Sequence, residues 1–274
     1  MPTAANASVD VPPIFNAPAL HERFKDLAGM RAFAQQIIDW WDRDRGRDFK
    51  MKTEYVQGAG PIVWTYATHA VEVMRVVLRQ SELGRMAVVA SEVRLMIELG
   101  MTSIWLYLQP VPAAKALLHE TLRQHRATVR DAIAVGHDGF EELLKRLDAE
   151  QAENDGDSSP TGKSFEQRCR AIDGGLEMYV MWRLYSRMSH ATGNLADHYL
   201  LEVPISAENP LGIALNPDGE EDTHESSLGL AICMLLVALK ACDLIDAEGR
   251  RTTQIRTAAK KIGLGLDFKL IATE

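Results

Sequence analysis

Apolar residues recur every three or four positions along most of the chain. In the stretch from position 20 to position 41, seven large apolar side chains follow one another at such steps. This is the period of an amphipathic α-helix with one buried face. The side chains are Leu20, Phe24, Leu27, Met30, Phe33, Ile37 and Trp41. The pattern predicts an all-α protein.

Glycine and proline divide the pattern into separate helices. The segment 136–139 interrupts one of them, because its two glycines favour a turn. Short connections between helices favour antiparallel neighbours. We therefore predict an antiparallel bundle of about six to eight helices, with one irregular excursion near 203–223 that has room for a short hairpin. The expected helices cover about 20–41, 61–80, 81–108, 113–153, 165–199, 224–245 and 251–261.

The two ends of the chain differ in character from its middle. Residues 1–18 are rich in Ala, Pro, Asn and Ser and lack the basic and apolar regions of a secretory signal. The sequence therefore predicts a flexible N-terminal arm over 1–18, a single helical-bundle domain over 19–262 and a C-terminal tail over 263–274.

Composition favours a cytoplasmic protein that does not associate with membranes. The chain has 274 residues, of which 46% are hydrophobic and 25% charged, as in ordinary soluble proteins. The apolar run from Leu228 to Leu239 is shorter than the roughly 20 residues of a membrane span. The cysteines Cys169, Cys233 and Cys242 form no CxxC pair, so we expect no structural metal and a reducing compartment. The net charge of −8 excludes a wholly basic nucleic-acid-binding surface but leaves room for a local one.

The best candidate site lies in the stretch from 182 to 198, where cationic, imidazole and amide side chains interrupt apolar neighbours. On a helix, five of them recur every three or four residues and form one polar stripe, with Ser186 beside it. The five are Arg183, Arg187, His190, Asn194 and Asp197. An ordinary solvent-facing stripe is the alternative interpretation, although such a stripe is expected to carry Glu, Lys and Gln.

A second polar stripe crosses the apolar helix expected over 81–108. It consists of Ser91, Arg94, Glu98 and Thr102. Arg94 and Glu98 can pair along the helix, and either charge alone would be costly in apolar surroundings. The stripe therefore predicts a cavity or a partner across the bundle, or else a structural ion pair between packed helices. A smaller patch on the preceding helix contains Thr65, His69 and Glu72.

These motifs resemble a group of uncharacterised, all-helical bacterial proteins. The group carries an R-x-x-x-E helix and, downstream, an aromatic-x-x-x-S-x-x-x-H helix. Here the two motifs are Arg94 to Glu98 and Trp182 to His190, and the resemblance spans roughly residues 60 to 245. The chain also resembles, more distantly, the HEPN superfamily of helical bundles, in which an Arg and a His are separated by four to six residues. Six residues separate Arg183 from His190.

The HEPN resemblance implies RNA binding or metal-independent RNA cleavage in a toxin or defence system. Arg183 would bind the scissile phosphate and His190 would act as general base or acid. The resemblance further implies a homodimer with opposed motif helices and an antitoxin or regulatory partner. In the nuclease families the residue after the arginine is usually polar, whereas here it is Leu184. Arg187 and Asn194 would position the substrate, and Asp197 would orient the imidazole.

The sequence leaves open whether the protein is an enzyme. The alternative is a non-catalytic binding or regulatory module in which Arg94, Glu98 and His190 belong to a structural polar network. A di-metal carboxylate bundle needs Glu-x-x-His on two helices, and the sequence has only Glu221 to His224. Phosphate-binding GxGxxG and GxxxxGK[ST] loops are absent as well. We therefore expect neither a metal ion nor a cofactor.

Overall fold

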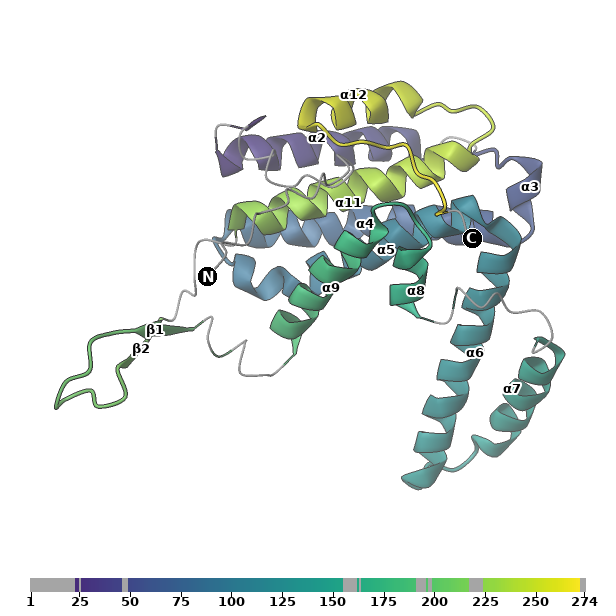
Figure 1. The fold of residues 1–274 in the computed structure, drawn as a ribbon. Coiled ribbons are helices and arrows are strands. Elements are labelled where there is room, and N and C mark those ends of the chain that lie inside the picture. The colour runs from purple at the N-terminus through teal and green to yellow at the C-terminus, as the bar shows by residue number, and fades with distance from the viewer. Residues whose placement is uncertain are drawn as a thin grey trace, which may run out of the picture.

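The computed structural model confirms the predicted all-α bundle (Figure 1). Its described part contains ten α-helices and one small two-stranded sheet. Two of the ten helices are short, which brings the long ones close to the predicted number. The described residues are 23–24, 26–45, 49–154, 162, 164–190, 196, 199–216 and 224–271.

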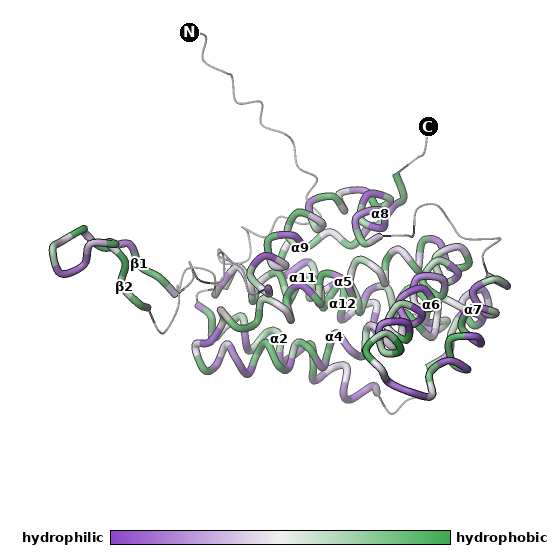
Figure 2. Tube along the Cα trace, turned by 90° about the horizontal axis from the view of Figure 1, so that it is seen from below, coloured by the Kyte–Doolittle hydropathy of each residue, from purple (hydrophilic) through white to green (hydrophobic). Residues whose placement is uncertain are grey.

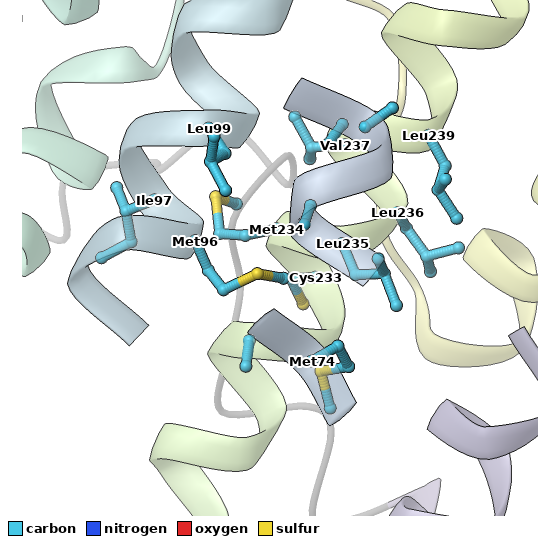
Figure 3. Close-up of a cluster of buried hydrophobic side chains, with 14 of the residues drawn as sticks. Met74, Met96, Ile97, Leu99, Cys233, Met234, Leu235, Leu236, Val237 and Leu239 are labelled. Carbon is cyan, nitrogen blue, oxygen red and sulfur yellow. The ribbon is translucent and has the colours of Figure 1, made fainter. Parts of the chain in front are cut away.

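Three long helices form the centre of the bundle: α4 (Ala59–Glu82), α5 (Ala90–Leu108) and α11 (His224–Ile245). Their contact surfaces interlock through methionine, leucine and valine side chains (Figure 3). At Gly100 of α5, an added Cβ would lie only 3.2 Å from the Met234 carbonyl oxygen of α11. The glycine therefore lets the two helices approach closely.

The central helix α11 is the most apolar element. Residues 225–245 are long and apolar enough to cross a membrane, but 89% of their most apolar window is buried inside the protein. This is the burial of a core helix. All three cysteines are buried and free, and burial raises the pKa of Cys233 to about 12.

Two helices cover the side of α11 that faces away from α5: α2 (Leu27–Arg45) and α12 (Thr252–Ile262) (Figure 1). The apolar stripe predicted for the first of these is confirmed. Its buried members are Met30, Phe33, Ile37 and Trp41, whereas Leu20 lies outside the described residues. A short helix, α3 (Thr53–Val56), leads into α4.

A pair of antiparallel helices, α6 (Pro110–Ala134) and α7 (Glu141–Asn154), extends from the bundle (Figure 1). The pair has a small core of its own, made by Leu122, Val129 and Leu147. The predicted break between them is confirmed, because both glycines of the connection have positive φ angles, +86° and +89°.

One predicted helix begins later than expected. The helix predicted from 81 to 108 is wrong at its start, because α4 continues through Glu82 and a turn follows. Gly84 allows this turn with a φ of +68°. A short 3₁₀-helix, η2 (Met86–Val89), then leads into α5.

A β-hairpin lies where the irregular excursion is predicted near 203–223, although its first strand begins before position 203. Its strands β1 (Leu200–Glu202) and β2 (Ile213–Leu215) pair antiparallel, with Leu201 opposite Ala214. The hairpin stands away from the helices in both views (Figures 1 and 2). It is therefore not part of the bundle core.

The helix predicted from 165 to 199 is wrong in length and continuity. Two helices occupy its first part, α8 (Phe165–Arg170) and α9 (Gly175–Ser189). Gly174, with a φ of +71°, separates them. At the other end, the hydroxyls of Ser186 and Ser189 donate to the carbonyl oxygens four residues earlier, at 2.7 and 2.6 Å. Such side-chain bonds slightly weaken the last turn of the helix.

Candidate functional site

The predicted pair of Arg94 and Glu98 is formed, and its partner across the bundle is Trp182. The Nη2 of Arg94 lies 3.2 Å from the Oε1 of Glu98. The indole Nε1 of Trp182 donates to the same oxygen at 2.5 Å. The guanidinium of Arg94 also lies 4.8 Å from the centre of the Trp182 ring, within the range of a cation–π contact. These contacts join α5 to α9.

Most of the second polar stripe lines a cavity of about 520 Å³. The cavity lies among α4, α5, α6 and the short helix α8. Ser91 is exposed and bonds to Glu92 instead, at 2.7 Å. In the smaller patch on α4, Glu72 pairs with Arg75 at 3.4 Å. Thr65 and His69, the other two residues of that patch, line the cavity. The polar lining from these stripes consists of Thr65, His69, Arg94, Glu98 and Thr102.

The cavity has a second carboxylate that the sequence did not single out, Glu120 of α6. Its oxygens accept hydrogen bonds from Arg123 at 2.8 Å and from Gln124 at 2.7 Å. The hydrogen bonds from Arg123 hold the pKa of Glu120 below its ordinary value, although burial opposes this shift. Glu120 therefore remains charged and is already bound by donors of its own helix.

A second arginine of the cavity, Arg168 of α8, was also missed. Its Nε and Nη2 both donate to the carbonyl oxygen of Gly162 at 3.3 Å. The guanidinium lies 5.4 Å from the centre of the buried Trp105 ring. Burial lowers the pKa of Arg168, while the nearby charges of Glu120 and Glu98 oppose this effect. Burial raises the pKa of the neighbouring Tyr66, because it disfavours the charged form of this side chain too.

Two of the other predicted residues lie on the exposed outer face of α9. Arg183 and Arg187 are exposed and one turn apart, as the stripe predicted. The prediction of a continuous helical stripe is wrong beyond Arg187, because α9 ends at Ser189 and His190 has extended backbone angles (φ −102°, ψ 149°). His190 is exposed as well. The remaining members, Asn194 and Asp197, lie outside the described residues.

Next to these cations, α9 exposes an apolar ridge, which consists of Leu176, Val180 and Leu184. The three residues follow one another at four-residue steps, and 44%, 52% and 45% of their surfaces are exposed. The ridge includes Leu184, the residue that departs from the nuclease pattern. Such a row of exposed apolar side chains is typical of a surface that contacts another molecule.

The predicted site residues therefore belong to two places. Arg94 and Glu98 line the cavity, whereas Arg183 and His190 do not. Ser186 belongs to neither group. It is partly buried, and its hydroxyl donates to the main-chain carbonyl oxygen of Trp182. Within the described residues, no three His, Cys, Asp or Glu side chains gather closely enough to hold a metal ion. Comparison of the chain with models of protein families, with curated proteins and with solved structures gives no match.

Proposed function

We propose that the protein binds RNA on the outer face of α9 and cleaves it without a metal ion. The observation that carries this proposal is the exposure of Arg183 and His190 on an open surface, outside the cavity. A polymer can lie along an exposed helix face, whereas the cavity has the volume of a small-molecule site. The resemblance of the Arg183–His190 spacing to HEPN nucleases supplies the reaction.

The reaction needs a group that exchanges protons near neutral pH and a cation for the phosphate. The imidazole of His190 takes the proton of the ribose 2′-hydroxyl as its oxygen attacks the phosphorus. The P–O2′ bond forms and the P–O5′ bond breaks. The protonated imidazole of His190 then gives its proton to the leaving 5′ oxygen. Arg183 binds the phosphate oxygens through its planar guanidinium. Arg187, one turn away, contributes to phosphate binding.

The apolar ridge of α9 supports a homodimer. Leu176, Val180 and Leu184 would be removed from water if the α9 helices of two copies packed against each other, which is a favourable change. This packing would bring two sets of cationic side chains to one surface. The proposal places the protein in the cytoplasm, with an antitoxin or regulatory protein as a further partner.

The test is incubation of the purified protein with single-stranded RNA in the presence of a metal chelator. We expect cleavage by the wild-type protein and a fall of about 100-fold or more in the His190→Ala and Arg183→Ala variants, since general acid–base and charge-stabilising groups contribute this much. The matched control is Arg79→Ala, which removes an exposed arginine from α4 that pairs with Glu82. Equal activity of the control, the wild type and both variants contradicts the proposal.

A second candidate function is a non-catalytic binding or regulatory module. The observation that favours it is the set of contacts among Arg94, Glu98 and Trp182, which join α5 to α9 as a structural network does. RNA that is bound but stays intact in the wild-type protein would favour this candidate.

A further inference from the structure

We infer that the cavity among α4, α5, α6 and α8 binds a small organic anion. An acidic group of the ligand contacts Arg94 and Arg168, and its apolar part lies against Leu95, Leu99 and Phe165. This inference does not depend on the proposed reaction with RNA, because Arg183 and His190 do not line the cavity.

The size and the walls of the cavity fit a small molecule. Its volume of about 520 Å³ lies within the range of pockets that enclose small ligands. Three consecutive long helices and the short helix α8 build it, so its shape depends on how these four helices pack. Ten of the described lining residues are polar or charged and three are apolar, so the cavity suits a polar ligand with a small apolar part.

Among the described residues, the cations around the cavity outnumber the carboxylates. The cations are Arg94, Arg168 and, bound to the cavity residue Glu120, Arg123. The two carboxylates are those of Glu98 and Glu120. The described side chains are thus three cations against two carboxylates, which favours an anionic ligand group over a neutral or cationic one.

Both carboxylates already have donors of their own. Oε1 of Glu98 accepts from Trp182 and pairs with Arg94. The two oxygens of Glu120 accept from Arg123 and Gln124. They therefore compete weakly with a ligand for the remaining N–H groups of the cavity.

Those remaining N–H groups belong to the two cavity arginines. Arg94 Nε is buried and has no acceptor within the described part of the chain. Arg168 bonds there to one main-chain carbonyl oxygen and forms no salt bridge with a carboxylate. A guanidinium carries five N–H donors in a planar fork that matches a carboxylate or a phosphate. An oxyanion is therefore the ligand group that satisfies these donors.

The test uses isothermal titration calorimetry with two probes, phenylacetate and phenyl phosphate, which carry the two kinds of oxyanion on the same ring. The neutral phenylacetamide is the control ligand. We expect saturable binding of at least one anion and no measurable binding of the amide. The preferred anion identifies the acidic group as a carboxylate or a phosphate. Binding of neither anion, or equal binding of the amide, overturns the inference.

Two arginine variants on the same short helix locate the binding site. Arg168→Met removes one of the two arginines that line the cavity and is expected to weaken anion binding at least tenfold. Arg170→Met is the matched control, because Arg170 is exposed and pairs with Glu166 at 2.9 Å outside the cavity. It is expected to bind the anion as the wild type does. Unchanged affinity in a folded Arg168→Met variant, or equal losses in both variants, overturns the inference, and circular dichroism establishes that each variant is folded.

Discussion

Replacement of Gly175 by alanine is expected to lower the free energy of unfolding by about 3 kcal/mol, as overpacking of a core does. Gly175 is the first residue of α9 and is buried. A Cβ at this position would overlap the carbonyl oxygen of Cys169 and lie 3.0 Å from Cε of Met101. The carbonyl belongs to the backbone at the end of α8, so it cannot move aside as a flexible side chain can. The result would be displacement of α9 from α5.

Urea denaturation followed by circular dichroism measures this effect. The matched control is Gly29→Ala in α2, where the nearest atom to an added Cβ, Oδ1 of Asp26, lies at an ordinary 3.5 Å. This control is expected to be neutral or slightly stabilising, because alanine favours a helix over glycine. A Gly175→Ala protein as stable as the control variant would show that α9 does not pack against α8 as described.

Replacement of Trp182 by alanine is also expected to cost about 3 kcal/mol, the cost of removing a large, well-packed aromatic side chain. Its ring packs 5.2 Å from that of Phe165 and 5.7 Å from that of Tyr179, measured between centroids. It also lies beneath the guanidinium of Arg94 and donates to Glu98. The substitution removes all of these contacts at once.

The variant Trp182→Phe separates the hydrogen bond from the ring contacts. It keeps an aromatic ring but loses the indole N–H, so its expected loss is about 2 kcal/mol, the usual net value of a hydrogen bond to a charged group. Denaturant unfolding of both variants gives the two values. A loss in Trp182→Phe as large as that in Trp182→Ala would assign the whole effect to the bond with Glu98 and contradict a role for ring packing.

The sequence predicts the helices well because helix formation follows from local periodicity. The extent of α11 and the buried face of α2 follow directly from the spacing of apolar residues. The end of α9 at Ser189 does not, because the spacing of apolar and polar residues continues past this position.

The candidate site could be predicted only in part. Arg94 and Glu98 stand out because they are charges in an apolar helix, and the structure places them in a cavity wall. Arg168 and Glu120 do not stand out, since each lies on a helix with many other charged residues. They become site residues only through the packing of α6 and α8 beside α5, which no local pattern determines.

The central claim is that RNA binds to the outer face of α9 and not to the cavity. Hydrogen–deuterium exchange of the protein, alone and with single-stranded RNA, tests it most directly. Bound RNA is expected to slow the exchange of backbone amides around Arg183 to His190 and to leave the cavity face of α5, from Arg94 to Thr102, unchanged. Protection confined to that face of α5, or no protection around His190, would contradict the account.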